Sequence, residues 1–348
     1  PRSTQRDLAQ KTGFSVGTVN TLIKEAMQKQ LIAQGKSVAG TYELTGAGDD
    51  FLEQFKVDGA LIIAAGFGSR FVPLTFETPK GLLEVFGERM IERQIRQLHE
   101  VGITDIAVGY LKEKFEYLID KYQVKLLYNP EYASKNTLTT IYRSREVLAG
   151  KNMYILSSDN WLRDNMFHTY ECGAWYASSY MEGDTSEWCL SFNKKGRITH
   201  VEVGGHDSWV MYGPVFFSAT FSEQFRPLLE QYYHTPGTEQ FYWENVLIEH
   251  LDTLEMDINR QPEHQIYEFE NLEELRRFDP RYQNHSDNTA LELVSQVFEV
   301  PESEIHDIRC LKSGMTNKSF LFQLQGRHYI CRIPGPGTEL LINRKEEA

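Results

Sequence analysis

Cysteine is scarce in this 348-residue chain, which contains four cysteines and no CxxC pair. Cys172, Cys189, Cys310 and Cys331 are scattered along the sequence, a spacing that favours neither a zinc site nor a disulfide framework. We therefore expect a protein of a reducing compartment, the cytoplasm.

Long apolar runs and an excess of positive charge are also missing. No uninterrupted apolar stretch approaches the ~18 residues of a membrane-spanning helix, and no secretory signal is visible. The formal net charge of −13 argues against general affinity of the whole chain for nucleic acids or membrane surfaces, although it is compatible with a local basic patch. With 41% hydrophobic and 24% charged residues, the composition is that of a soluble globular protein, and the length allows two or three domains.

The most informative stretch begins at residue 61. Leu61 to Ala65 is a short apolar run, typical of a buried strand in a parallel sheet. In the segment GFGSR that follows (66–70), two glycines let backbone N–H groups approach a polyphosphate, and Arg70 adds charge-assisted hydrogen bonds. Lys80, one loop further on, is suited to hold a second phosphate group. The pattern is neither a P-loop, since no Gly-Lys-Ser/Thr closes it, nor a dinucleotide fingerprint, since the third glycine is absent.

The motifs AAGFGSRF and TPKGLLEV resemble the signature of nucleotidyltransferases that join an NTP to a phosphorylated small molecule. The plain alternative for a lone GxG is a glycine turn after any strand. The resemblance implies Arg70 and Lys80 as catalytic residues. It implies nucleotide contacts at Ala64, Ala65, Gly66, Phe67, Gly68, Ser69 and Arg70.

Residues 1–56 predict a winged helix-turn-helix domain. Two helical patterns are separated by a break at Gly13, and a hairpin pattern ends at Leu44. This order resembles bacterial winged-helix regulators. Residues 1–44 hold six Lys and Arg against three Asp and Glu, the sign of charge expected for phosphate contact. DNA is therefore a predicted partner, and a protein-contact module is the alternative.

Apolar strand segments alternate with helical patterns between residues 57 and 282, which we predict to form one domain. Segments typical of buried strands are 106–110, 125–129 and 153–160. This alternation predicts an α/β fold with a doubly wound, mostly parallel sheet. Ligands of such folds bind at the carboxyl ends of the strands.

Asp159 follows the end of a predicted central strand at the same edge as the glycine loop. We expect it to hold Mg²⁺ between the protein and the phosphates, although capping a turn is the alternative role. The resemblance implies Glu244 as the second carboxylate, at a position where the family pattern has Asp. Asn129, Asn136 and Thr137 are candidates for the cytosine end of a nucleotide, because amide and hydroxyl groups can read base edges.

Aromatic residues are dense between residues 170 and 245, and most of them must belong to the core. A trimethylammonium head is bound by aromatic faces with a carboxylate nearby, whereas a sugar needs hydrogen bonds to its hydroxyls. The segments SSDNWL, GDTSEWCLSF and FYWENVL resemble bacterial CTP:phosphocholine cytidylyltransferases. This resemblance implies a choline-head site formed by Glu187, Trp188, Tyr212, Tyr242 and Trp243.

Residues 283–348 predict a helix followed by three strands, an α+β segment. SGMTNKSFLF and CRIPGPGTELLINRKEE resemble the opening of the N-terminal lobe of choline and ethanolamine kinases. The catalytic and metal-binding aspartates that a kinase needs would lie beyond Ala348, so we expect no kinase activity from this chain. We also expect residues 286–348 to be dispensable for nucleotidyl transfer.

Together these patterns predict Mg²⁺-dependent transfer of CMP from CTP to phosphocholine. The products would be pyrophosphate and CDP-choline, used to decorate cell-surface glycans with phosphocholine. Alternative acceptors are phosphoethanolamine, 2-aminoethylphosphonate or a sugar 1-phosphate. A different class of function is a transcriptional regulator in which the nucleotidyltransferase fold only senses its ligand.

Overall fold

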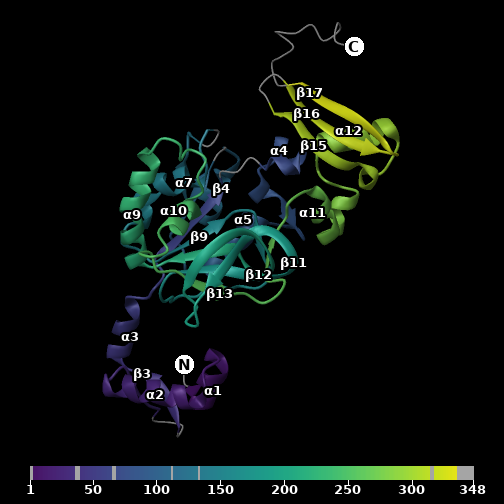
Figure 1. Cartoon of the computed structure of the whole chain (residues 1–348). Helices are drawn as coiled ribbons and strands as arrows, with labels where there is room; N and C mark the ends of the chain where they lie inside the picture. Colours follow the sequence, from purple (N-terminus) through teal and green to yellow (C-terminus); the bar gives the residue numbers. More distant parts are fainter. Residues whose placement is uncertain are drawn as a thin grey trace. The chain divides into compact units, whose positions relative to one another are not determined.

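The structure, a computed structural model, describes residues 3–35, 40–64, 68–110, 113–131, 134–313 and 317–334. The chain divides into two compact units (Figure 1). The first comprises residues 1–57 together with 168–172, and the second comprises residues 58–167 and 173–348.

The first unit is a winged helix-turn-helix. Its elements are β1 (Ser3–Thr4), α1 (Gln5–Thr12), α2 (Val16–Gln28), β2 (Ile32–Gln34), β3 (Thr41–Leu44) and α3 (Gly46–Glu53). Gly13 ends α1 with a φ of +71°, a conformation that favours glycine. Ser15 then caps α2 by accepting a hydrogen bond from the backbone N–H of Thr18. The strands form a sheet of order β1-β3-β2, so the predicted order of helix, turn, helix and hairpin is confirmed.

A seven-stranded sheet forms the centre of the second unit, with strand order β13-β11-β12-β9-β4-β7-β8 (Figure 1). The strands are β4 (Gly59–Ala64), β7 (Ile106–Tyr110), β8 (Lys125–Tyr128), β9 (Met153–Ser157), β11 (Trp175–Phe192), β12 (Ile198–Phe217) and β13 (Asp257–Arg260). β4 lies parallel to β7 and β9, whereas β12 is antiparallel to β9 and β11. The predicted α/β core is confirmed, with a sheet that is mixed at the end where the long β11–β12 hairpin joins it.

Helices cover this sheet, and short elements connect them. The helices of the second unit are α4 (Leu74–Glu77), α5 (Met90–Glu100), α6 (Tyr117–Tyr122), α7 (Thr137–Arg143), α8 (Arg145–Leu148), α9 (Ala219–His234), α10 (Trp243–Glu249), α11 (Leu272–Phe278) and α12 (Thr289–Phe298). The 3-10 turns are η1 (Ser69–Phe71), η2 (Lys80–Leu82), η3 (Glu113–Phe115), η4 (Pro280–Gln283) and η5 (Glu302–Glu304). Two small antiparallel sheets pair β5 (Glu84–Val85) with β6 (Glu88–Arg89) and β10 (Asn160–Leu162) with β14 (Ile266–Glu268). Helices α7, α9 and α10 contact one another and pack together in Figure 1.

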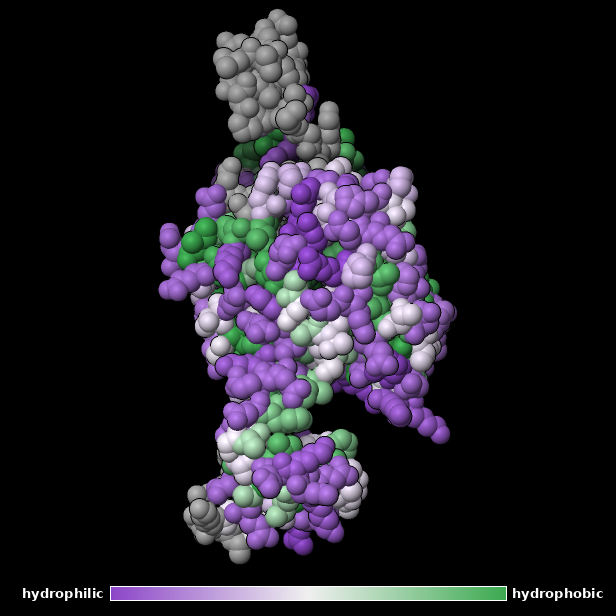
Figure 2. Space-filling view, turned by 90° about the vertical axis from the view of Figure 1, so that its left-hand side faces the viewer, coloured by the Kyte–Doolittle hydropathy of each residue, from purple (hydrophilic) through white to green (hydrophobic). Residues whose placement is uncertain are grey.

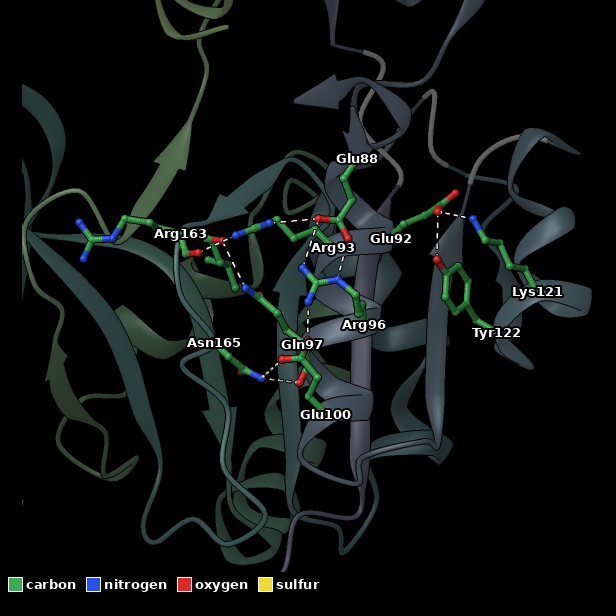
Figure 3. Close-up of polar contacts among 11 residues, drawn as sticks. Glu88, Glu92, Arg93, Arg96, Gln97, Glu100, Lys121, Tyr122, Arg163 and Asn165 are labelled. Atoms are coloured by element: carbon green, nitrogen blue, oxygen red, sulfur yellow. Dashed lines mark hydrogen bonds and ion pairs between the residues drawn. The ribbon is translucent and has the colours of Figure 1, made fainter. Parts of the chain in front are cut away.

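Charged side chains join α5 to the segment after β10 (Figure 3). Glu88 accepts hydrogen bonds from Arg93 Nη1 (3.0 Å) and Arg96 Nε (2.8 Å). Burial alone would raise the pKa of Glu88, but the hydrogen bonds from Arg96 and Arg93 lower it below its ordinary value. Arg93 also donates to the backbone carbonyl of Arg163 (2.5 Å). This network therefore fixes the segment that follows β10, a few residues after Asp159 in the sequence.

The C-terminal segment forms an antiparallel sheet of order β15-β16-β17 beside α12. Its strands are β15 (His306–Ser313), β16 (Asn317–Leu324) and β17 (Arg327–Pro334). Phe320 and Phe322 of β16 are buried in the same hydrophobic cluster as Phe71 and Phe76, which follow β4. A continuous core therefore crosses the predicted boundary between residues 282 and 283.

Among the described residues, no helix is long and apolar enough to cross a membrane. Figure 2 shows a face on which hydrophilic residues predominate and hydrophobic residues gather only in small patches. Many apolar side chains of the second unit, among its described residues, are instead buried in a cluster around β9, β12, α9 and α10 or in a cluster around α12 and β16.

Candidate active site

The loop that follows β4 folds back on itself. Gly68 has a φ of +66°, and a Cβ there would lie 3.0 Å from Thr75 Cγ2 and 3.3 Å from Lys80 Cβ. Thr75 also donates a hydrogen bond to the carbonyl oxygen of Gly68 (2.8 Å). Only glycine combines this backbone conformation with so close an approach. As a result the turns η1 and η2, which carry Arg70 and Lys80, lie side by side.

Lys80 Nζ lies between two carboxylates, 2.7 Å from Asp159 Oδ2 and 3.9 Å from Glu268 Oε1. Gly81 makes this approach possible, because a Cβ there would lie 2.5 Å from Ser158 Oγ and 2.7 Å from Ser158 Cβ. The loop therefore packs its backbone directly against the residue that precedes Asp159.

Helix α5 holds the turn that presents Asp159. The buried Gln94 donates from Nε2 to the carbonyl oxygens of Ser157 (2.8 Å) and Asn160 (2.6 Å), which flank this turn. Burial would raise the pKa of Asp159, but the charge of Lys80 and its hydrogen bond lower that pKa below the ordinary value. Asp159 is therefore ionised at neutral pH.

Glu268 is a site residue that the sequence analysis did not single out. It lies at the end of β14, where antiparallel pairing with β10 places it opposite Asn160. Tyr212 fixes its backbone, since the hydroxyl donates to the carbonyl oxygen of Glu268 (3.2 Å) and accepts from its N–H (3.0 Å). Burial, followed by the negative charge of Asp159, raises the pKa of Glu268 to about 7.

Glu244, which the resemblance implies as the second metal-binding carboxylate, is held by other contacts, and its metal role stays a prediction. Its Oε1 accepts a hydrogen bond from the hydroxyl of Tyr176 (3.2 Å), and its buried Oε2 has no hydrogen-bond partner among the described residues. Burial raises the pKa of Glu244 to about 7. Among the described residues, the two carboxylates within 4.0 Å of Lys80 Nζ are those of Asp159 and Glu268, and pairing of β14 with β10 brings Glu268 to this edge of the sheet.

A cavity of about 300 Å³, here called the loop cavity, lies beside Lys80 and Asp159. Its lining is Ile63, Ala64, Gly68, Ser69, Arg70, Phe71, Pro79, Lys80, Gly81, Asn136, Thr137, Ser157, Ser158, Asp159, Tyr242, Glu268 and Glu270. The exposed guanidinium of Arg70 forms an ion pair with Glu270. The cavity thus brings together basic groups, backbone N–H groups and carboxylates, as a phosphate and metal site requires.

The predicted nucleotide contacts fall into three groups. Ala64, Gly68, Ser69, Arg70, Asn136 and Thr137 line the loop cavity. Ala65, Gly66 and Phe67 lie outside the described residues. Asn129 is placed elsewhere: its side chain donates to Thr140 Oγ1 (3.0 Å) and accepts from the N–H of Glu131 (3.0 Å). This local turn, for which asparagine is well suited, keeps the buried Asn129 out of the cavity lining.

A second cavity of about 210 Å³, here called the hairpin cavity, lies along β12 and the start of α10. Its lining is Ile63, Thr137, Ile155, Leu156, Ser157, Asn160, Tyr176, Glu187, Met211, Tyr212, Gly213, Val215, Tyr242, Trp243, Glu244 and Glu268. Ile63, Thr137, Ser157, Tyr242 and Glu268 line both cavities, so the two adjoin at the carboxyl ends of β4 and β9.

Most residues predicted for a choline head line the hairpin cavity. Glu187, Tyr212, Tyr242 and Trp243 do so, and Tyr176 adds a further ring that we did not select. Trp188 instead contacts Tyr242 edge-on, with ring centroids 5.8 Å apart, and is absent from the described lining. Trp188 is partly buried and packs against the hydrophobic cluster around β9, β12, α9 and α10.

The residues present fit a divalent cation. Asp159 and Glu268 are two carboxylates that face the single charge of Lys80, and burial, followed by the negative charge of Asp159, raises the pKa of Glu268. Within the described ranges, no group of three or more His, Cys, Asp or Glu residues could hold a metal ion. A pair of carboxylates suits Mg²⁺, which commonly takes one or two from the protein and completes its coordination with substrate phosphates and water.

Comparison with known proteins agrees with this architecture. The model of the family described as nucleotidyl transferase matches residues 59–173, and that described as winged helix-turn-helix DNA-binding matches residues 1–33. The chain is 33% identical over 229 residues to a choline-phosphate cytidylyltransferase of Streptococcus pneumoniae, covering 65% of this chain and 99% of that protein. It is 35% identical over 227 residues to a 2-aminoethylphosphonate cytidylyltransferase of Lancefieldella rimae, covering 64% and 92%.

Solved structures extend the comparison. The structure of the CTP:phosphocholine cytidylyltransferase from Streptococcus pneumoniae matches with a TM-score of 0.61 at 33% identity, over 65% of this chain and 98% of that one. A putative glucose-1-phosphate thymidylyltransferase from Bacillus anthracis shares the fold with a TM-score of 0.54 at 16% identity, over 65% and 95%. The chain therefore belongs to the nucleotidyltransferase family, in which it is similar to cytidylyltransferases, and it carries a winged helix-turn-helix at its N-terminal end.

Proposed function

We propose that this protein transfers CMP from CTP to phosphocholine, forming CDP-choline and releasing pyrophosphate. The observation that carries the proposal is the meeting of two cavities at Glu268, next to Lys80 and Asp159. One cavity is lined by the glycine loop and the other by aromatic rings. A nucleotide in the first and a phosphorylated acceptor in the second would place their phosphates side by side.

The reaction is an in-line attack by a phosphate oxygen of the acceptor on the α-phosphorus of CTP. The bond from the α-phosphorus to the bridging oxygen breaks, pyrophosphate leaves with that electron pair, and no covalent enzyme intermediate is needed. Arg70 and the backbone of Gly68 and Ser69 would bind the triphosphate, and Lys80 would bridge to the attacking phosphate. Asp159 and Glu268 would hold Mg²⁺, which when bound neutralises charge on the phosphates.

The rings of the hairpin cavity support a cationic head group. Tyr176 and Trp243 stack at 6.0 Å between ring centroids, and Tyr242 shares the cavity lining with them. Quaternary ammonium groups bind to such aromatic faces by cation–π attraction. Glu187 adds a carboxylate to the same lining, as a choline head requires.

A second acceptor class is favoured by one specific observation. Glu244 Oε2 is buried in the hairpin cavity and has no hydrogen-bond partner among the described residues. A trimethylammonium has no N–H to donate, whereas a primary ammonium has three. Phosphoethanolamine and 2-aminoethylphosphonate, which carry such a group, are therefore the alternative acceptors, whereas nothing in the cavity favours a sugar 1-phosphate.

The function is tested by measuring pyrophosphate release from CTP and Mg²⁺ with each acceptor in turn. We expect turnover with phosphocholine at a kcat/KM at least about tenfold above that with phosphoethanolamine or 2-aminoethylphosphonate, because the smaller, well-hydrated ammonium gains less from the rings. If kcat/KM is instead higher for phosphoethanolamine or 2-aminoethylphosphonate, the proposed acceptor is that compound and not phosphocholine. Tight CTP binding without turnover would support the ligand-sensing regulator instead.

Glu244→Gln separates the two acceptor classes, because it keeps the shape of the side chain and removes its charge. If a primary ammonium binds this carboxylate, kcat/KM for the amine acceptors should fall by roughly tenfold to a hundredfold, the size of a lost charged hydrogen bond. Turnover of phosphocholine should change by less than about threefold, because aromatic faces dominate its binding. Glu182→Gln, at an exposed position of β11, is the matched control and should leave both acceptors unchanged.

Gly81→Ala tests the placement of Lys80. The added methyl group would lie 2.5 to 2.7 Å from atoms of the Ser158 side chain, so η2 must move away from Asp159. We expect kcat to fall by about a hundredfold, because displacements of about 1 Å have such effects. Gly46→Ala, where a Cβ meets nothing within 4 Å, should retain full activity in the same assay. Wild-type kinetics for Gly81→Ala would show that Lys80 need not touch Asp159 during turnover.

We also propose that the winged helix-turn-helix contacts DNA. Lys24, Thr18 and Thr21 are exposed on α2, the helix that enters the major groove in such domains. Fluorescence anisotropy with duplex DNA should give an affinity that falls steeply with salt, and Lys24→Ala should reduce the salt dependence by about one unit of the log–log slope. Binding that is absent at low salt would assign this domain to protein contacts.

Two further predictions, the use of the product and the identity of the C-terminal segment, remain proposals. CDP-choline would serve phosphocholine decoration of cell-surface glycans. A three-stranded antiparallel sheet next to α12 is compatible with the opening of a choline or ethanolamine kinase lobe, which is the identity we propose for residues 283–348.

A further inference from the structure

The loop from Gly68 to Leu83 has two faces with different surroundings. One face carries Arg70 and Lys80 into the lining of the loop cavity. The other face consists of apolar side chains that are buried in the cluster shared with α12 and β16. These side chains are Phe71, Val72, Leu74, Phe76 and Leu83. The loop that carries the proposed catalytic groups is therefore packed between the nucleotide site and the C-terminal segment.

Two side chains of the C-terminal segment bind the loop backbone directly. Asn288 Nδ2 donates to the carbonyl oxygen of Pro73 (3.2 Å), and Lys318 Nζ donates to that of Phe76 (2.7 Å). Asn288 is fully enclosed, with 1% of its surface exposed, and also caps α12. The two donors hold the two ends of the short helix α4, at Pro73 and Phe76.

Lys318 makes a second contact with the same turn. Its ammonium lies 5.4 Å from the centroid of the Phe76 ring, and that ring packs against Phe320, with centroids 6.5 Å apart. A cation close to the carbonyls at the C-terminal end of a helical turn is electrostatically favourable. Lys114 of η3 donates to the next carbonyl, that of Glu77. The carbonyl oxygens of the last two residues of α4 thus each accept a hydrogen bond from a lysine side chain.

The position of α4 determines the position of Lys80. Thr75, in the middle of α4, donates to the carbonyl oxygen of Gly68, and Gly68 packs against the Lys80 side chain. Thr78 and Pro79 alone separate the end of α4 from η2, which begins at Lys80. A shift of α4 must therefore reach Lys80, whose ammonium lies 2.7 Å from Asp159.

We propose that Lys318 and Asn288 are positioning residues for nucleotidyl transfer. By holding α4 they keep Lys80 against Asp159, so the C-terminal sheet is a working part of the transferase and not a dispensable appendage. This inference rests on the proposed function for its kinetic readout. It runs against our expectation that residues 286–348 are dispensable, which stays a prediction, and it implies that any partner that displaces β16 lowers turnover.

The test compares Lys318→Met, which keeps the apolar stem over Phe76 and removes the donor, with Lys318→Arg, which keeps a donor. Lys194→Met, at an exposed position between β11 and β12, is the matched control. For Lys318→Met we expect kcat to fall by about tenfold or more, while the KM for the acceptor stays within about twofold. Lys318→Arg should recover most of the rate, and Lys194→Met should match the wild type.

Hydrogen–deuterium exchange of the full chain gives a readout that needs no substrate. Peptides covering residues 69–83 should exchange faster in Lys318→Met than in the wild type, whereas peptides from β4 and β9 should not change. A lower melting temperature with unchanged kcat and unchanged exchange would show that Lys318 is only a structural contact, and it would overturn the proposal. Faster exchange with unchanged kcat would also overturn it. If the wild-type protein turns over no acceptor, the proposed function fails, and the exchange of residues 69–83 alone decides whether Lys318 positions the loop.

Discussion

The contact of one cation with two carboxylates is the constraint on which the site depends. Lys80 Nζ lies 2.7 Å from Asp159 and 3.9 Å from Glu268, largely shielded from solvent. Charges placed in such surroundings are costly unless they are paired and hydrogen-bonded. Two negative groups face one positive group here, and burial, together with the negative charge of Asp159, raises the pKa of Glu268 to about 7. A divalent cation would offset the second negative charge, and we propose that one binds here together with the phosphates of CTP.

Each neighbouring element fixes one of these three charged groups. Gln94 of α5 binds the carbonyls on either side of Asp159, and Tyr212 of the hairpin binds the backbone of Glu268. Lys80 is held by the loop after β4, which the C-terminal segment covers from behind. The precision of the site is therefore shared among segments that lie far apart in the sequence. Two cavities of different chemistry meet where these segments converge.

The sequence predicted those parts of the site that depend on residues close together in the chain. The apolar run that begins at Leu61 lies in β4, and Asp159 was recognisable because it comes two residues after the end of the central strand β9. Glu268 escaped notice because β14 is only three residues long and reaches the site through pairing with β10, a contact between distant segments. Asn129 was misplaced because its side chain bonds to its own turn. The packing of β16 against Phe76 could not be predicted either, because an apolar strand pattern indicates burial but does not identify the segment that the strand packs against.

The central claim is that Asp159 and Glu268 hold Mg²⁺, whereas Glu244 lines the cavity for the acceptor. Calorimetric titration with CTP, with and without Mg²⁺, tests this claim most directly. The account predicts that the wild-type protein and Glu244→Gln bind CTP at least about tenfold more tightly with Mg²⁺ present, because the cation offsets two carboxylates next to the phosphates. Asp159→Asn and Glu268→Gln should each lose most of this dependence. Loss of the dependence in Glu244→Gln, with its retention in Glu268→Gln, would contradict the account.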